Sequence, residues 1–205
     1  MADEIEIKVD LGSFSNYLKL LGHLGSTGQE EHQQNFFFDT TDHLLKNRGW
    51  ALRLRTTDSQ AFVTLKGTTS QAGAAAVREE IESEIPLALG GQVARSEKSI
   101  LMVIAEPIER IRLLVQEREL IPLISFDNFR KTHPYRLNDG EYQFEVDRTE
   151  FADGHVDYEL EIEVEAHTKV YGLVHELSRL FASLEIPFVL QTESKLARAL
   201  DHPRQ

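Results

Sequence analysis

The sequence predicts an α+β protein in which an eight-stranded antiparallel β-barrel has helices packed outside it. Charged and apolar residues alternate in several short segments, which is the pattern of strands whose two faces meet different surroundings. Turn signals separate most of these segments, so neighbouring strands are expected to run antiparallel. Apolar stripes with helical spacing lie between and after the strands. Together these observations favour a closed or nearly closed barrel.

Composition places the chain among ordinary globular domains. Its 205 residues are 41% hydrophobic and 27% charged, and no linker or low-complexity run divides them, so a single domain over residues 1–205 is expected. No apolar run reaches the length of a membrane helix or a signal peptide. A cytoplasmic protein without a membrane partner is therefore expected.

Charge and cysteine content narrow the chemistry. Without cysteine there can be no disulfide, no thiolate nucleophile and no cysteine-bound zinc. The formal net charge of −12 argues against a nucleic-acid partner. A small anionic substrate is still compatible with this charge if basic residues gather at one site.

The first half of the chain is mostly strands. Residues 4–8 alternate charged residues with isoleucines, and Ser13 can cap a helix whose apolar stripe covers residues 14–21. Further strands are expected at 35–40, 50–55, 61–66 and about 78–85. The Gly/Thr/Ser/Ala-rich segment 67–76 is expected to be a mobile loop.

The apolar period changes in the middle of the chain. Between residues 91 and 119 it predicts one helix around 100–104 and a second around 108–115, with Pro107 in the first turn of the second helix. The remaining expected elements are strands at 123–132, 141–150 and 155–165, hairpin turns at 138–140 and 153–154, a helix over 170–184 and a short last helix after Thr192.

The alternation also predicts which strand faces lie inside the barrel. Helices with apolar stripes must pack on the isoleucine and leucine faces, so the charged faces are expected to line the lumen, where about eight strands leave room for one small ligand. For one strand alone, charges turned to water would be the simpler interpretation. However, acidic alternation recurs at 80–84 and 159–163, whereas Arg53, Arg55 and Lys66 occupy other strands. The recurrence favours a polar tunnel.

The crowded carboxylates predict a metal ion. Neighbouring carboxylates raise one another's pKa unless a cation neutralises them. Oxygen ligands in a chain without cysteine suit Mg²⁺ or Mn²⁺, and Mg²⁺ is usually shared between carboxylates and substrate phosphates. The basic strands would then bind the phosphates.

Several short motifs follow one another in a fixed order along nearly the whole chain. They are Glu4-x-Glu6-x-Lys8, Phe38-Asp39-Thr40, Leu52-Arg53-Leu54-Arg55, Thr64-Leu65-Lys66, Glu80-Ile81-Glu82, Val146-Asp147, Tyr158-Glu159-Leu160-Glu161 and Ser194-Lys195. This ordered set resembles the CYTH superfamily of triphosphate tunnel metalloenzymes, which includes thiamine triphosphatases, inorganic tripolyphosphatases and class IV adenylate cyclases. One Glu-x-Glu-x-Lys motif would be weak support, but the ordered set is specific.

The resemblance implies a tunnel that binds a triphosphate with basic residues and one or two divalent ions with carboxylates. The implied substrate-binding residues are Lys8, Arg53, Arg55, Lys66, Arg130 and Lys195. The implied metal-binding residues are Glu4, Glu6, Glu80, Glu82, Asp147, Glu159 and Glu161, of which Glu80, Glu82 and Asp147 could instead position water. Lys8, Glu161 and Lys195 are the expected catalytic residues. Arg78 and Arg136 stay outside this set.

The expected activity is metal-dependent hydrolysis of a small triphosphate by direct attack of water on a terminal phosphorus. Inorganic tripolyphosphate is the first expected substrate and thiamine triphosphate the second. Trp50 leaves this order open, because it could stack on a thiamine ring, although a tryptophan in such a place more often serves packing. The alternatives are a class IV-type adenylate cyclase and a non-catalytic polyphosphate-binding module. A P-loop motif is absent from the sequence. A monomer or homodimer is expected.

Overall fold

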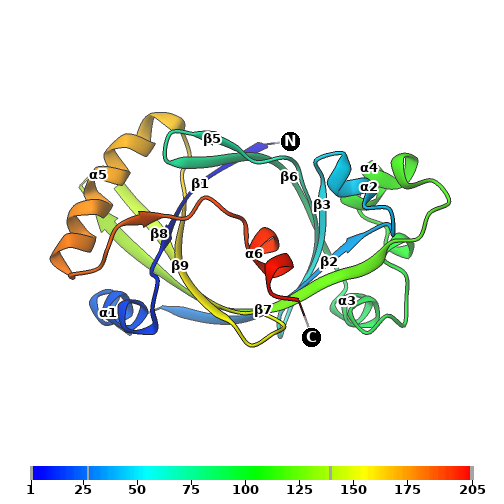
Figure 1. The fold of residues 1–205 in the computed structure, drawn as a ribbon, viewed down its shortest axis with the longest axis horizontal. Helices are drawn as coiled ribbons and strands as arrows, with labels where there is room; N and C mark the ends of the chain where they lie inside the picture. Colours follow the sequence, from blue (N-terminus) through cyan, green and yellow to red (C-terminus); the bar gives the residue numbers. More distant parts are fainter. Residues whose placement is uncertain (1, 27, 139, 204–205) are drawn as a thin grey trace.

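The computed structural model describes residues 2–26, 28–138 and 140–203. Eight antiparallel strands follow the order β1-β9-β8-β7-β2-β3-β4-β6, and pairing between β6 and β1 closes the ring (Figure 1). These strands are β1 (Ala2–Asp10), β2 (Gln29–Asp39), β3 (Ala51–Thr56), β4 (Ala61–Lys66), β6 (Ala75–Ile85), β7 (Ile121–Leu137), β8 (Gly140–Glu150) and β9 (Val156–Glu163). The predicted eight-stranded antiparallel barrel is confirmed.

Helices cover two sides of the barrel and one of its openings. On one side lie α1 (Phe14–Leu24) and α5 (His167–Ser183), and on the other lie α2 (Leu44–Asn47), α3 (Leu87–Ala94) and α4 (Glu106–Val115) (Figure 1). The last helix, α6 (Lys195–Asp201), lies over the opening seen in Figure 1. Among the described residues, no helix is both long and apolar enough to cross a membrane.

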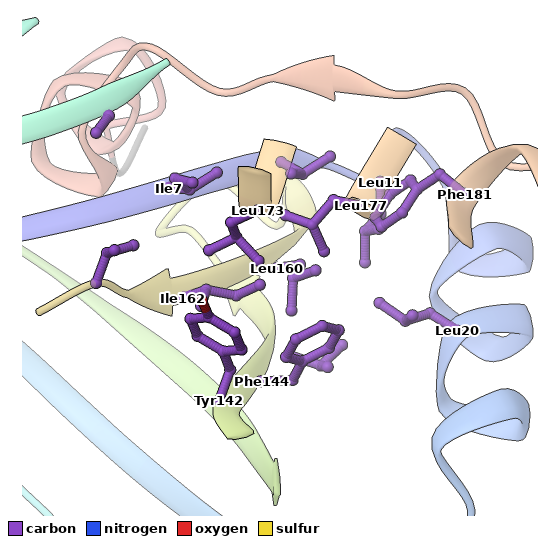
Figure 2. Packing of buried hydrophobic residues seen from close by; sticks show 14 of the residues in the cluster. Ile7, Leu11, Leu20, Tyr142, Phe144, Leu160, Ile162, Leu173, Leu177 and Phe181 are labelled. Carbon is purple, nitrogen blue, oxygen red and sulfur yellow. The ribbon is translucent and has the colours of Figure 1, made fainter. Parts of the chain in front are cut away.

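The apolar faces of the strands are buried under these helices. Ile7 of β1 and Ile162 of β9 pack with Leu173 and Leu177 of α5 in one core cluster (Figure 2). A second cluster joins β3 and β4 to α3 and α4; its fully buried members include Leu52, Leu54, Val63, Leu65, Ile108 and Ile111. Because strand residues point alternately to opposite faces, this packing turns the charged neighbours into the barrel, as predicted.

The segment 67–76 is more ordered than predicted. It contains a short strand, β5 (Ser70–Ala72), which pairs with the beginning of β6. Gly73 lies in the turn between them with φ of 66°, a conformation that glycine adopts without the steric penalty of a side chain. Another short strand, β10 (Val189–Leu190), pairs with β1.

The helix predicted around 100–104 is wrong. Residues Ile100–Met102 form a single 3₁₀ turn, Val103 is already extended, and Ile104 is 87% exposed. The chain needs these residues to reach α4, whose N-cap is Ala105 and whose first turn contains Pro107 as predicted.

Helix α3 begins before the region in which a helical period was predicted. Glycines at 90 and 91 lower its helix propensity, which conceals the helix in the sequence. Gly90 lets α3 approach β4, because a Cβ atom there would lie 2.5 Å from the Cβ of Ala61.

Strands β2 and β7 are longer than predicted. The beginning of β2, from Gln29 onward, pairs with β7 starting at Thr132, whereas the end of β7, residues 133–137, pairs with β8. The hairpin turn predicted at 138–140 includes residue 139, which lies outside the described residues.

Candidate functional site

A cavity of about 530 Å³ runs through the barrel interior, and all eight barrel strands contribute to its wall. Its described basic residues are Lys8, Arg53, Arg55, Lys66, Arg78, Arg130 and Lys195, and its described acidic residues are Glu4, Glu6, Glu80, Glu82, Glu145, Glu161 and Glu163. The two sets are equal in number, so when all are ionised their charges balance. All six predicted substrate-binding residues therefore lie in one cavity.

The first group of charges lies on β1, β6 and β4, where β6 pairs with β1 on one side and with β4 on the other. Arg78 is at its centre: Nε donates a hydrogen bond to Glu4 Oε2 at 2.7 Å, and Nη2 lies 3.0 Å from Glu6 Oε1. Lys66 Nζ donates to Glu80 Oε2 at 2.6 Å and lies 3.6 Å from Glu4 Oε2. We call Glu4, Glu6, Lys66, Arg78 and Glu80 the seam cluster, since β1 and β6 form the closing seam of the barrel.

Strand register explains these pairs. Arg78 lies directly opposite Glu4 in the β1–β6 ladder, and Lys66 lies directly opposite Glu80 in the β4–β6 ladder. Directly opposite side chains on one face are near enough for oppositely charged groups to interact. At this seam, therefore, acids and bases that lie on separate segments of the sequence become direct neighbours on the barrel wall.

The seam cluster shifts the pKa values of its members. Burial acts to raise the pKa of Glu4, but the positive charges of Lys66 and Arg78 outweigh it and lower this pKa to about 2. Burial, together with the neighbouring charges of Arg53 and Arg78, lowers the pKa of Lys66 to about 8. Burial raises the pKa of Glu80.

Arg53 and Arg55 lie on β3 and line the cavity, and we call them, together with Lys8 and Lys66, the basic wall. Arg53 Nη2 donates to Thr64 Oγ1 at 3.2 Å and lies 3.4 Å from Glu82 Oε2. Its buried Nε has no hydrogen-bond partner among the described residues, so this wall holds an unused donor. Burial and the adjacent charge of Arg55 lower the pKa of Arg53 to about 9. A bound anion would accept a hydrogen bond from the unpaired donor and would offset the repulsion between the two arginines.

The remaining predicted substrate-binding lysine, Lys8, is held loosely. Its Nζ lies 3.6 Å from Glu6 Oε1 and 3.5 Å from the backbone oxygen of Glu193. Because these contacts are long, a phosphate oxygen could replace them at little loss. The Lys8 side chain is almost fully buried, so its charge would interact strongly with such a phosphate.

The second group of charges lies on β7, β8, β9 and α6. Its acids are Asp147, Glu159 and Glu161, which we call the acid trio; one carboxylate oxygen from each lies within 4.8 Å of the others. Asp147 is directly opposite Glu159 in the β8–β9 ladder, so register alone places two acids side by side. Asp147 and Glu159 are fully buried behind the cavity wall, and Glu161 lines it.

Cations hold the acid trio together. Arg130 Nε and Nη2 donate to the two oxygens of Asp147 at 2.8 and 2.6 Å, and Nη2 also reaches Glu161. Lys195 Nζ lies 2.9 Å from both Asp147 Oδ2 and Glu161 Oε1 and also contacts Glu159 Oε1. One lysine from the last helix therefore touches all three acids.

These contacts separate the pKa values of the three acids. Burial alone would raise all three, but Arg130 and Lys195 lower the pKa of Asp147, and Lys195, Arg130 and Lys8 hold the pKa of Glu161 well below its usual value. For Glu159 burial prevails and raises the pKa. Nearby carboxylates raise the pKa of Lys195 despite its burial.

The acid trio fits a divalent ion in donor chemistry. Three carboxylates with closely spaced oxygens are the ligands that Mg²⁺ and Mn²⁺ favour. Lys195 and such an ion would use the same oxygens, so they would compete. Among the described residues, Glu4 and Glu6 lie in the seam cluster with Arg78 and outside this three-carboxylate group.

Three charged residues outside the predicted set have central contacts. Arg78 joins the seam cluster, Glu145 lines the cavity beside Arg130, and Arg198 contacts Glu159. Arg78 and Glu145 could have been found by the two-residue alternation that connects them to Glu80 and Asp147. Arg136, the other arginine held back from the predicted set, is exposed on β7. Trp50 packs against the second core cluster, outside the cavity, which favours the packing interpretation.

Helix α6 closes one mouth of the tunnel. Ser194 caps it by accepting a hydrogen bond from the Ala197 backbone N–H at 3.1 Å, so Lys195 starts the helix at the cavity wall. Leu196 and Ala199 pack on Phe37 and Phe126, apolar residues of the barrel interior. One helix therefore covers an apolar part of the lumen and delivers a lysine to the acid trio.

Comparisons with known proteins agree with this geometry. The CYTH domain matches residues 2–199 of the chain. A solved structure from Hippeastrum, HpAC1, described as a proposed adenylyl cyclase with a dominant triphosphatase activity, is 26% identical with a TM-score of 0.85, covering 98% of this chain and 97% of that one. A proposed adenylate cyclase from Bacillus halodurans is 23% identical with a TM-score of 0.71, covering 97% and 98%.

A more distant structure, PH1819 from Pyrococcus horikoshii, shares 16% identity with a TM-score of 0.60 and coverage of 97% and 98%. A search of curated proteins gave no match. The last two structures support the fold alone. With a family match over nearly its whole length, the chain belongs to the CYTH domain family.

Proposed function

We propose that this protein is a divalent-metal-dependent triphosphatase whose first substrate is inorganic tripolyphosphate, with thiamine triphosphate second. The main observation in favour of this function is that the basic wall and the acid trio lie at the same cavity of about 530 Å³. The dominant triphosphatase activity described for the Hippeastrum relative supports the same reaction.

The basic wall would bind the triphosphate. Arg53 and Arg55 can each offer several donors to phosphate oxygens, whereas Lys8 and Lys66 offer mobile point charges. Phosphate would replace carboxylates as partner in the pairs of Lys66 with Glu80 and of Arg53 with Glu82. Cations that already face the lumen need little rearrangement, so the site is largely preformed.

The carboxylates would hold the metal. Asp147, Glu159 and Glu161 are the first candidates because their oxygens lie together, and Glu4, Glu6, Glu80 and Glu82, which line the cavity, are the further candidates. A bound Mg²⁺ or Mn²⁺ would offset charge on phosphate oxygens and lower the pKa of a coordinated water.

The chain's own residues would complete the hydrolysis of a terminal phosphoanhydride bond. Lys8 and Lys195 would stabilise the charge that develops on the departing diphosphate, and Glu161, whose low pKa keeps it ionised, would orient the attacking water by accepting its hydrogen bond. Water adds to the terminal phosphorus, and the bridging P–O bond breaks with its electron pair passing to the diphosphate oxygen. The products are phosphate and diphosphate, and the proton lost by the water passes to solvent. Positioning and electrostatics would supply most of the rate enhancement.

A product assay on metal-stripped protein tests the proposal. Tripolyphosphate, thiamine triphosphate, ATP and GTP are each supplied with Mg²⁺ or Mn²⁺, and phosphate, diphosphate and cyclic AMP are measured. Metal-dependent phosphate release from tripolyphosphate supports the proposal. Diphosphate together with cyclic AMP from ATP would identify a cyclase, and binding without any product would identify a polyphosphate-binding module.

A further inference from the structure

We propose that Arg198 is a positioning residue that orients the Glu159 carboxylate for metal binding by the acid trio, an inference that rests on the proposed metal-dependent function. Arg198 lies on α6 outside the cavity lining, and it is largely buried. Its Nη2 donates a 2.7 Å hydrogen bond to Glu159 Oε2. It would therefore act through Glu159 without touching the substrate.

The two oxygens of Glu159 have different partners. Arg198 binds Oε2, whereas the oxygen in contact with Lys195 is Oε1. Lys195 also contacts Asp147 and Glu161, so Oε1 is the Glu159 oxygen that faces the centre of the trio. By occupying Oε2, Arg198 sets the rotation of the carboxylate and leaves Oε1 for a cation shared with the other two acids.

Arg198 is itself fixed at two points. Its Nη1 lies 3.3 Å from Asp157 Oδ2, and Asp157 and Glu159 share one face of β9 because they are two residues apart. The planar guanidinium thus bridges two carboxylates of one strand. Its helix is aligned by the Ser194 cap, and the three-residue spacing of Lys195 and Arg198 places both on the β9 side.

The difference between the two cations on α6 gives them separate tasks. Lys195 is a flexible point charge on the cavity side, so it can leave the trio when an ion or a phosphate arrives. If Lys195 were the only partner, Glu159 would then be a buried carboxylate without a fixed orientation. Arg198 keeps its hydrogen bond in both situations and so preserves the ligand oxygen.

The test measures Mn²⁺ binding by calorimetry on the metal-stripped full chain, without substrate. Partners of metal ligands typically contribute about 10- to 100-fold in affinity, so Arg198→Gln should weaken Mn²⁺ binding by about tenfold or more. Arg198→Lys, which keeps the charge but has no planar fork, should recover part of the loss. Tripolyphosphate binding in chelator should hardly change, because the basic wall is intact.

Arg148→Gln is the matched control, because Arg148 is on β8 next to Asp147 but on the outer face, where it pairs with Glu150. The Arg148→Gln variant should bind Mn²⁺ like the wild type.

A double variant tests whether Arg198 acts through Glu159. In a Glu159→Gln background, Arg198→Gln should add no further loss of Mn²⁺ affinity, because the carboxylate that Arg198 positions is gone. A purely structural role would instead lower affinity in both backgrounds.

Each other outcome is decisive. If Glu159→Gln weakens Mn²⁺ binding but Arg198→Gln and Arg198→Lys do not, the positioning role is wrong and the metal assignment stands. If Arg198→Gln weakens Mn²⁺ and tripolyphosphate binding equally, or if it fails to fold and Arg198→Lys loses both ligands, Arg198 is a structural residue. If Glu159→Gln leaves Mn²⁺ affinity unchanged, the metal role of the trio fails first, and that result identifies the proposed function as the error.

Discussion

Arg78 donates a 2.7 Å hydrogen bond to Glu4 across the two strands that close the barrel. The pair is three-quarters or more buried on both sides, and Arg78 also neutralises Glu6. The closing seam of the fold therefore runs through the wall of the candidate active site, and the first prediction concerns both.

Arg78→Met should destabilise the protein, because Glu4, Glu6 and Glu80, whose oxygens lie 2.7, 3.0 and 3.8 Å from the guanidinium, lose a shared cation. Breaking a buried ion pair by removing one partner typically costs about 3–5 kcal/mol, and the neighbouring Lys66 should reduce the loss to about 2–3 kcal/mol. Urea unfolding measures the change. Arg95→Gln, which removes an exposed arginine that pairs with Glu97, should leave the stability close to that of the wild type. Equal stability of the two variants would contradict the role of Arg78 at the seam.

Lys66 should make stability depend on alkaline pH. Its folded-state pKa is about 8, whereas a lysine in an unfolded chain has a pKa of about 10.4. Below pH 8 both states hold the proton, and the penalty for the buried charge is fully present. Between these two values the unfolded state binds more protons, so the free energy of unfolding contributed by this residue rises with pH.

The comparison of wild type with Lys66→Met isolates this contribution. The difference between the free energies of unfolding, wild type minus Lys66→Met, should increase by about 1–3 kcal/mol between pH 7.5 and pH 10. This follows from about 1.4 kcal/mol for each unit of pKa difference. Urea titrations at a series of pH values measure it. A difference that stays constant with pH would show that Lys66 keeps an ordinary pKa in the folded protein.

Tripolyphosphate should bind without metal. In excess chelator it should raise the melting temperature, because a ligand that prefers the native state stabilises that state by mass action. Arg53→Ala should reduce the shift, although it could stabilise the empty protein by relieving repulsion with Arg55. Scanning calorimetry with and without Mg²⁺ tests both points. Absence of any shift in chelator, or equal shifts in both proteins, would argue against a preformed basic wall.

Metal-dependent turnover should require Glu161 and Glu4. Glu161→Gln and Glu4→Gln are expected to lower kcat/KM by about 100-fold or more, as removal of a group that stabilises the transition state commonly does, while the fold stays nearly intact. Phosphate release from tripolyphosphate at saturating Mg²⁺ is the measurement. Glu165→Gln serves as the control, because Glu165 is exposed and forms an ion pair with Lys169. Unchanged turnover in both tunnel variants would remove these residues from the metal assignment.

Two adjacent glycines in α3 should respond in opposite directions to alanine. Gly90→Ala should destabilise the protein by about 1–3 kcal/mol, because its Cβ would collide with Ala61 on β4. In Gly91→Ala the atoms nearest to the new Cβ belong to the end of the exposed Arg95 side chain, so this change should be neutral or stabilising by up to about 1 kcal/mol. Thermal unfolding of the two variants distinguishes them. Similar effects would mean that α3 can shift away from the barrel.

Local sequence patterns determined which side of each barrel strand faces the lumen. Glu4, Glu6 and Lys8 alternate with isoleucines, and the helices that follow have apolar stripes that must be covered, so the charged faces could only turn inward or to water. The recurrence of this pattern decided between the two. The turn residues and the ordered motifs were also local, and they predicted the barrel and its family.

Only the tertiary structure decided which charges meet. Alternation predicts the face of a residue but not its partner, because register comes from pairing between segments that are far apart in the chain and from the closing of the ring. That pairing placed Arg78 opposite Glu4 and Asp147 opposite Glu159. It also allowed a helix near the end of the chain to bring Lys195 into the acid trio and Arg198 behind it. A two-residue period cannot encode these contacts, since they depend on how the whole chain packs.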